Sequence, residues 1–340
     1  MERTPASLSA RLLPALLVAG APLAADPAAP PVGPYRPLAL LGRGTMGEVH
    51  LAEQVTPVRR LVALKTLPPG VPAHGEVGRR LADEGQALAI ANHDHVVRLY
   101  DAGTDAAGQP YLALEYVPGE PITAYAARHH LSLDERLQLF LQVCDAAAHL
   151  DEHQLVHRDL KPANILVTEQ GGMPSVKVID LGLACYHPTA HVDVEDPVVG
   201  SPGYMAPEQA RPGSAPLTGR ADVYALGALL FELVTGTLPL ADPTKTPAGP
   251  RPSLVERQES LWRRSPPSLR TRAQRCRMRG VSRALDRVAQ RALTPDPAAR
   301  FAGAGALASA VRDEVQRRAR RQRARRVLTR MLVGAALLAL

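Results

Sequence analysis

Apolar and polar residues alternate along much of the first third of the chain, which is the pattern of strands buried on one face. Residues 36–52 alternate, break at glycines and alternate again, which predicts a strand, a tight turn and a second strand. Further strands are predicted at 61–67, 96–100 and 111–117. Residues 76–91 instead have apolar positions at helical spacing, so this region should form a sheet with one amphipathic helix.

Beyond Val117 the spacing of the apolar residues becomes mostly helical. It predicts helices at 133–153, 222–233, 284–293 and 305–315. Proline and arginine crowd residues 241–280, which is typical of a surface loop around one helix. A strand-rich first third followed by a helical remainder predicts an α+β fold.

The composition narrows the class of protein further. The 340 residues are enough for one large two-lobed domain with short extensions, and 46% of them are hydrophobic, enough for a sizeable core. The three cysteines, Cys144, Cys185 and Cys276, have no paired spacing. A disulfide framework and a zinc site are therefore not expected, and the chain fits a reducing cytosol.

The first 32 residues are rich in alanine, proline and leucine and carry little charge. Their stretch 12–25 is apolar enough for the core of a signal peptide, but Pro14 interrupts it and Glu2 offsets Arg3 before it. We therefore interpret 1–32 as a flexible or short helical extension, with a signal peptide as the alternative.

The most informative stretch is 157–164, His-Arg-Asp-Leu-Lys-Pro-Ala-Asn. It sets an acid, a base and an amide at fixed offsets, which suits transfer of a phosphoryl group from Mg-ATP to a hydroxyl. Asp159 can accept the hydroxyl proton, Lys161 can neutralise the phosphoryl oxygens, and Asn164 can hold a metal ion.

A glycine-rich string precedes the first lysine of interest. Gly42, Gly44 and Gly47 have the spacing GxGxxG, which lets a backbone approach phosphates and offer amides to them. Dinucleotide-binding folds use a similar string, but a helix follows it there, whereas a strand is predicted here. Lys65 ends the next strand and is placed to bind the α- and β-phosphates. Its carboxylate partner is expected on the helix 76–91, at Glu84 rather than the adjacent Asp83.

A second strand end carries a metal-binding carboxylate. The apolar strand that starts at Val176 ends in Asp180, Leu181 and Gly182. An Asp at a strand end, together with Asn164, suits Mg²⁺, which prefers oxygen ligands.

Together these motifs resemble the eukaryotic-like serine/threonine protein kinases of bacteria, over about 35–312. The resemblance implies a bilobal protein-kinase-like fold in a domain spanning 33–312, with a small β-rich N-lobe (about 35–116) and a larger, mostly helical C-lobe (about 117–312). It implies ATP and Mg²⁺ as cofactors, serine and threonine hydroxyls of proteins as acceptors, and Asp159, Lys161 and Lys65 as catalytic residues. The residues it places around ATP are Leu41, Gly42, Gly44, Gly47, Val49, Ala63, Lys65, Glu84, Leu114, Glu115 and Val117.

The resemblance also covers the segment after Asp180. Such kinases commonly have phenylalanine where Leu181 stands, so the packing of the inactive state is the property this substitution concerns. Thr189 and Ser201 are candidate phosphorylation sites, and Arg158 is the type of residue that receives a phosphorylated loop. An acidic loop (Asp193, Glu195, Asp196) could instead mimic phosphate. The residues expected in substrate docking or in the scaffold are Ser201, Glu208, Asp222 and Arg300.

The C-terminal tail carries the net charge. That charge is +7, and residues 312–330 alone hold nine arginines against Asp313 and Glu314. Nucleic acid is not expected as a partner, because no aromatic residues are interleaved and the basic residues are not spread over the fold. The apolar residues 331–340 would form about 15 Å of helix, half of a hydrocarbon core of about 30 Å.

We therefore expect 313–330 to be a juxtamembrane segment and 331–340 the start of a transmembrane helix, in a truncated chain. This places the kinase domain in the cytoplasm at the inner face of the cell membrane, with anionic lipid contact through 317–340. The alternatives are a helix lying on the lipid surface, a nucleic-acid-binding tail and a plain solvated tail.

The main functional prediction is a non-specific serine/threonine protein kinase that signals and autophosphorylates, with a homodimer as the candidate arrangement for autophosphorylation. The alternative is a nucleotide-binding pseudokinase scaffold, although such proteins usually lack one of Lys65, Asp159 or Asp180. Small-molecule kinases generally lack the Ala-Pro-Glu docking segment, which this chain has at 206–208.

Overall fold

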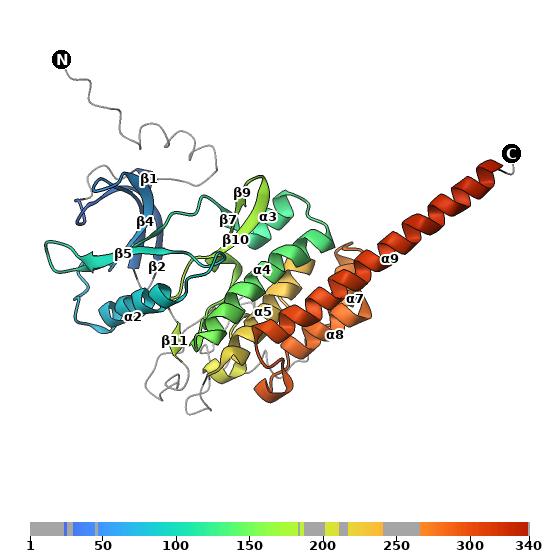
Figure 1. The fold of residues 1–340 in the computed structure, drawn as a ribbon. Coiled ribbons are helices and arrows are strands. Elements are labelled where there is room, and N and C mark those ends of the chain that lie inside the picture. Colours follow the sequence, from blue (N-terminus) through green and yellow to red (C-terminus); the bar gives the residue numbers. More distant parts are fainter. Residues whose placement is uncertain are drawn as a thin grey trace, which may run out of the picture.

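An antiparallel sheet forms the N-terminal lobe and helices form most of the C-terminal lobe, as Figure 1 shows. The computed structural model describes residues 24–25, 30–44, 47–182, 184–186, 201–210, 217–240 and 266–338. This arrangement confirms the predicted α+β, bilobal fold.

The N-lobe sheet has the strand order β1-β2-β3-β4-β6-β5 among the described residues. Its strands are β1 (Ala24–Ala25), β2 (Tyr35–Gly44), β3 (Gly47–Gln54), β4 (Arg60–Thr66), β5 (Leu99–Thr104) and β6 (Pro110–Glu115). The helix α2 (Glu76–Ile90) packs on β5 and β6, and its buried side chains include Leu81, Glu84 and Leu88. The amphipathic spacing of this helix thus turns one carboxylate, Glu84, into the interior along with the apolar residues.

The C-lobe is built around α5 (Gly219–Thr235), which is buried along almost its whole length. A helix that is apolar on all sides belongs in a core, and α4 (Leu133–Glu152), α7 (Leu269–Arg275), α8 (Arg283–Ala292) and α9 (Ala304–Leu338) pack against it. Ser132 and Glu135 form a capping box that starts α4.

Short strands form the surface that faces the N-lobe. They are β7 (Glu120–Pro121), β9 (Ile165–Gln170) and β10 (Met173–Val178) in one sheet, and β8 (Leu155–Val156) with β11 (Cys185–Tyr186) in another. The helix α3 (Ile122–Arg128) follows β7 directly and packs on α5 and β9. The catalytic motif at 157–164 directly follows β8, so this surface carries it at the interlobe boundary.

Two predicted elements differ from the structure. The strand expected at 96–100 begins only at Leu99, because His95 and Val97 bond with their backbone to Val178 of the C-lobe instead of to the N-lobe sheet. The helix expected at 305–315 continues to Leu338 as one helix through the arginine-rich segment. Within the described part of the chain, no helix combines the length and apolar character needed to cross a bilayer.

The extension at 1–32 is only partly described. Ala24 and Ala25 form the edge strand β1, with Ala24 opposite Leu40 and Ala25 opposite Ala39 in β2. At least this part of the segment expected to be flexible is therefore ordered against the sheet. The domain boundaries at 32, 312 and 330 stay predictions.

Candidate active site

Lys65 lies where β4, α2 and the residue Asp180 meet. Its ammonium group donates to the two carboxylate oxygens of Glu84, at 2.7 and 2.6 Å, and to Oδ1 of Asp180 at 3.0 Å. Lys65 and Glu84 are both buried, whereas Asp83 is exposed. The helix partner of the lysine is therefore Glu84, as the sequence favoured.

Glu84 and Asp180 share the ammonium group of Lys65, and this arrangement shifts the pKa values of all three side chains. Burial lowers the pKa of Lys65, but the attraction of Glu84 and Asp180 outweighs burial and raises the pKa overall. Burial raises the pKa of Glu84 to about 7, with Asp180 adding to the rise and Lys65 opposing it. Burial acts in the same direction on Asp180, but Lys65 and the Gly182 amide lower its pKa to about 2. At neutral pH the pair Lys65–Asp180 is thus charged, and Glu84 is the group poised to gain or lose a proton.

Asp159, Lys161 and Asn164 come together in the loop after β8. Lys161 Nζ donates to Asp159 Oδ2 at 2.5 Å. The Asn164 side-chain amide donates to that same oxygen at 3.2 Å and to the Asp159 carbonyl at 3.0 Å. Oδ1 of Asp159 is buried and has no hydrogen-bond partner among the described residues. One oxygen of this carboxylate is fixed, and the other is left for a substrate group.

Asn164 and Asp180 are the candidate ligands of a metal ion. The Ile179 amide donates to the Asn164 carbonyl at 3.0 Å, which puts the two residues on neighbouring stretches of backbone. Asp180 uses only Oδ1 for Lys65 and for the Gly182 amide, and Asn164 uses only its side-chain nitrogen. Each therefore keeps a side-chain oxygen outside these bonds, and hard oxygen donors of this kind fit Mg²⁺.

The glycine-rich turn joins β2 to β3. Gly47 has φ +154°, and a Cβ there would lie 2.3 Å from the Thr66 carbonyl oxygen, so no other residue fits. A Cβ on Gly42 would meet no described atom within 4 Å, which leaves the turn open on that side. Leu41, Val49 and Ala63 lie partly exposed on β2, β3 and β4. Among the described residues, space for a phosphate is therefore present beside Gly42.

The hinge follows β6. Leu114 is buried, and the Glu115 amide already donates to the Arg98 carbonyl at 2.9 Å. Val117 is also buried, yet its N–H and C=O have no hydrogen bond to any described residue. Buried backbone groups are nearly always paired, so those of Val117 are suited to the edge of a heterocycle such as adenine.

The scaffold residues hold the catalytic loop from below. The carboxylate of Asp222 accepts the amides of His157 at 2.8 Å and Arg158 at 2.9 Å. Arg158 has φ +68°, a left-handed conformation that is uncommon for a residue with a side chain and that these bonds maintain. Arg300 forms a bidentate pair with Glu208, at 2.6 and 2.8 Å. Three of the four predicted residues, Glu208, Asp222 and Arg300, therefore form these contacts.

Ser201 is the predicted residue that the structure leaves apart from the catalytic group. No hydrogen bond between described residues links its hydroxyl to Asp159 or Lys161. These two already bond to each other, and Asn164 occupies the same carboxylate oxygen. The Ser201 carbonyl instead accepts the amides of Tyr204 and Met205, at 3.1 and 3.3 Å.

Part of the activation segment lies outside the residues that the structure describes. Thr189 and the acidic residues at 193, 195 and 196 lie outside the described residues. The segment starts in β11, which pairs with β8 beside the catalytic loop, and Leu181 is fully buried in the same core as Leu81 of α2. The Nε of Arg158 is buried without a hydrogen-bond partner among the described residues, so it retains a donor for an anion.

Two residues near the site escaped the sequence analysis. Lys177 is buried in β10 and donates to Glu115 Oε2 at 2.8 Å, which ties the hinge to the C-lobe. Gln209 accepts the Ala206 amide at 3.0 Å and donates to the Arg158 carbonyl at 2.8 Å, which joins the docking segment to the catalytic loop. The position of Lys177, a charged residue within a mostly apolar strand and three residues before Asp180, could have indicated its role from the sequence.

The glycines of β2 and β3, the backbone groups of Val117 and the unpartnered oxygen of Asp159 are the features expected of a nucleotide site between two lobes. The comparison with known families is more specific, because residues 35–311 match the protein kinase domain. The chain belongs to the protein kinase family.

Curated relatives place it with the bacterial serine/threonine kinases. The serine/threonine-protein kinase Pkn1 of Myxococcus xanthus is 36% identical over 82% of this chain and 38% of its own length. PrkC of Bacillus subtilis is 38% identical over 61% of this chain and 31% of its own length, and PknB of Mycobacterium leprae is 32% identical over 77% and 40%. The chain thus spans well under half the length of these relatives.

Proposed function

We propose that this chain is an active serine/threonine protein kinase that transfers the γ-phosphate of ATP to serine or threonine hydroxyls of proteins. The observation that carries this proposal is the Asp159 carboxylate, whose Oδ2 is held by Lys161 and Asn164 while its buried Oδ1 is unpartnered. A fixed carboxylate with one free oxygen is what a hydroxyl acceptor needs for alignment and deprotonation.

Each residue then has a defined part in the reaction. Asp159 Oδ1 would accept the hydrogen bond of the acceptor hydroxyl and take its proton as the oxygen attacks phosphorus. Lys161 would neutralise charge on the transferring phosphoryl oxygens, and Lys65, held by Glu84, would bind the other phosphates. Asn164 and Asp180 would hold Mg²⁺, which supplies charge neutralisation to the phosphate chain when bound.

The test is phosphate transfer by the purified full chain, with labelled ATP, Mg²⁺ and a generic serine/threonine substrate. Asp159→Asn should lower transfer by about 10²–10⁴-fold, the usual contribution of a positioned acid–base group. Its unfolding transition and its affinity for Mg-ATP should stay close to those of the wild type. Mg-ATP binding without transfer in the wild type would instead favour the pseudokinase alternative, and an undiminished Asp159→Asn would contradict the role of this carboxylate.

The finer proposals concern the tail and the mode of assembly. We propose that residues 317–340 contact anionic lipid at the cytoplasmic face of the membrane, supported by the exposed arginines of α9 and by the apolar residues after them. We also propose autophosphorylation between two copies, for which a rate rising with the square of enzyme concentration is the test. A rate that is first order would contradict it.

A further inference from the structure

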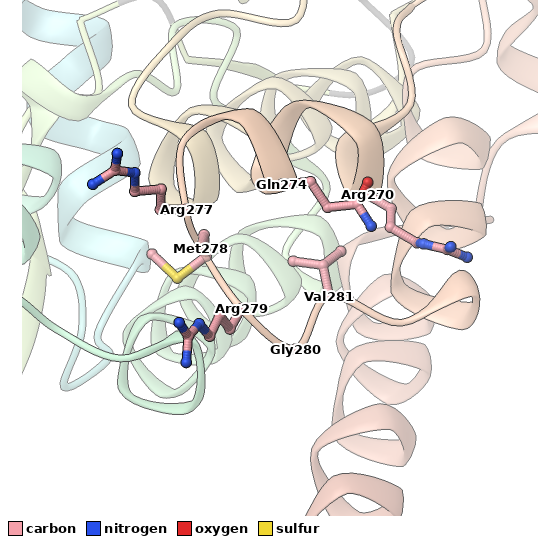
Figure 2. A pocket seen from close by; sticks show the side chains of 7 residues that line it. All are labelled: Arg270, Gln274, Arg277, Met278, Arg279, Gly280 and Val281. Carbon is pink, nitrogen blue, oxygen red and sulfur yellow. The ribbon is translucent and has the colours of Figure 1, made fainter.

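A pocket at the edge of the C-lobe is lined by arginines. It has a volume of about 580 Å³ and lies on α7 and the loop that leads to α8. Figure 2 shows Arg277, Met278 and Arg279 on one side of the pocket and Arg270 with Gln274 on the other, with Val281 between the two sides. The side chains of Arg277 and Arg270 extend outward in opposite directions. Among the described residues, no ion pair involves these three guanidinium groups, which leaves them for an anion.

The pocket belongs to a second basic stretch of the sequence, besides the one in the C-terminal tail. The net charge of the whole chain does not reveal it. Residues 270–287 hold seven arginines against one acidic residue, Asp286. The sequence analysis assigned the basic character to the tail alone, because acidic residues elsewhere cancel this stretch in the total. The positive charge therefore has two sources, and the structure shows that they meet.

The two basic stretches meet beside the pocket. The Arg318 guanidinium of α9 donates to the carbonyl of Gly280 in the pocket wall. Arg317, Arg320 and Arg321 on α9 are exposed. We call this combined surface the basic end face; its residues are Arg270, Arg277, Arg279, Arg317, Arg320 and Arg321, and Arg318 joins its two parts.

The basic end face lies where α9 leaves the body of the domain. The helix runs antiparallel to α4, from the pair Arg312–Asp145 to Arg318, whose Nε lies 2.6 Å from Asp134 Oδ1 in the first turn of α4. Beyond Gln322, which donates to Asp134 at 2.9 Å, α9 projects alone as Figure 1 shows. Its apolar residues from 331 onwards begin about 20 Å along the helix from Arg318.

We propose that the basic end face binds an anionic lipid surface, the same surface that the tail enters. This rests on the proposed tail–lipid contact. A headgroup layer is about 6 Å thick on each side of a bilayer. With residue 331 at the edge of the hydrocarbon and α9 upright, the face would stand about 14 Å from the headgroups, so contact of its arginine side chains requires α9 to tilt strongly towards the membrane surface.

The chemistry of the face favours lipid phosphate over nucleic acid. Guanidinium groups bind phosphate oxygens in a bidentate manner and attract an anionic leaflet within a screening length of about 8 Å. Neither 270–287 nor 312–340 contains a phenylalanine, tyrosine or tryptophan, so neither can stack bases. The pocket of about 580 Å³ is large enough to hold one headgroup.

The first test uses a native cysteine at the face. Cys276 is exposed, whereas Cys144 is buried and burial raises its pKa, so an environment-sensitive thiol dye on the full-length Cys185→Ala chain will report from Cys276. Vesicles of phosphatidylcholine with phosphatidylserine should shift its emission to the blue, and vesicles of phosphatidylcholine alone should not. The same dye at Ala324→Cys, with Cys276 and Cys185 removed, reports on the tail.

The two dye positions separate the two proposals. A shift at position 324 with none at 276 would overturn the end-face contact and leave the tail contact standing. The absence of a shift at both positions would overturn both. A shift at 276 that also occurs on uncharged vesicles would contradict an anionic ligand.

The second test removes the charges. The triple variant Arg270→Gln, Arg277→Gln and Arg279→Gln should bind phosphatidylserine vesicles at least about tenfold more weakly, since each arginine near an anionic leaflet contributes severalfold to affinity. The matched control replaces three exposed arginines elsewhere, Arg79, Arg98 and Arg128, and should bind as the wild type does. Equal losses in the two triples would show a net-charge effect and overturn the proposal. So would tighter binding of the wild type to duplex DNA than to the vesicles.

Discussion

Two buried charged pairs, one centred in each lobe, are built differently. In the C-lobe, Arg300 binds both carboxylate oxygens of Glu208 and gives its other donors to the carbonyls of Arg220, Thr294 and Pro295. In the N-lobe, Lys65 divides one ammonium between Glu84 of α2 and Asp180, which belongs to the other lobe.

This difference separates a fixed joint from an adjustable one. All hydrogen-bond partners of the planar Arg300 guanidinium lie within the C-lobe. A movement of any one of them relative to the rest would therefore break a hydrogen bond to Arg300. The ammonium of Lys65 rotates freely, and its two partners lie on elements that are not attached to each other. We infer that the first pair maintains the scaffold, whereas the second reports the position of α2 relative to the catalytic surface.

The largest expected effect is on stability, at the fixed joint. Arg300→Met should lower the free energy of unfolding by about 3–5 kcal/mol, because it removes the two hydrogen bonds to Glu208 and the three to backbone carbonyls in one change. Urea-induced unfolding followed by circular dichroism measures it. Arg300→Lys should recover little, since an ammonium cannot reproduce the planar set of donors.

Arg287→Met, at an exposed position of α8, is the matched control and should change stability by less than about 0.5 kcal/mol. A loss below about 1 kcal/mol in Arg300→Met would mean that the joint is not fixed, and the contrast between the lobes would fail.

At the adjustable joint the effect should fall on the rate. Lys65→Met should slow phosphate transfer by about 10²–10³-fold, as loss of a charge-stabilising donor does, with a smaller loss in nucleotide binding. Stability should hardly change, because Glu84, whose pKa burial raises to about 7, can take up a proton when its partner is gone. Single-turnover kinetics and urea unfolding on one preparation measure the two effects together. A destabilisation as large as that of Arg300→Met would show that the two pairs are alike.

The sequence predicted the parts of this contrast that depend on short spacing. The helices α2, α4, α5 and α8 were expected within three residues of their observed bounds, because each has an apolar stripe or an apolar interior. The motif residues were also placed by spacing, and the structure brings Lys65, Glu84 and Asp180 into contact. Their chemical roles stay predictions.

What the sequence did not predict depends on contacts between distant segments. Val96 and Val97 are apolar because they pack into the core between the lobes, so their pattern misplaced the start of β5. The helix α9 has no apolar stripe along its arginine-rich part, so periodicity could not show that it continues. The bond from Lys177 to Glu115 joins residues 62 positions apart, and no local pattern reveals it.

A third buried pair lies between the two extremes. Lys177 of the C-lobe holds Glu115 at the hinge, so Lys177→Met should loosen the adenine site more than the chemistry. We expect the KM for ATP to rise about fivefold, the effect of losing one partly exposed charged hydrogen bond, with kcat changed less. Initial rates over a range of ATP concentrations give both constants. Adding Glu115→Gln to Lys177→Met should raise the KM for ATP no further. If the two substitutions raise KM additively, the two residues do not act together on the hinge.

The smallest expected effect is a pH dependence at the seam where the lobes meet. His93, just after α2, stacks on His149 of α4 with ring centroids 4.9 Å apart. Burial lowers the pKa of His93 below 6.5, assisted by His149 and His95 and opposed by Asp94 and Asp145. Burial also lowers the pKa of His149, with His153 in the same direction and Glu152 against it.

Well above pH 6.5 these rings are neutral in the folded and the unfolded chain, so they add no pH dependence there; the dependence begins as the pH approaches 6.5 from above. As the pH falls below 6.5, the unfolded chain takes up protons that the folded chain resists, and stability should fall. Because both rings are partly exposed, we expect the loss to stay under about 1 kcal/mol. Urea unfolding at a series of pH values measures it, beside His93→Gln, in which the acid-induced loss should be smaller. If His93→Gln loses as much stability at low pH as the wild type, the groups that take up protons lie elsewhere, and the histidines between the lobes do not contribute to the pH dependence.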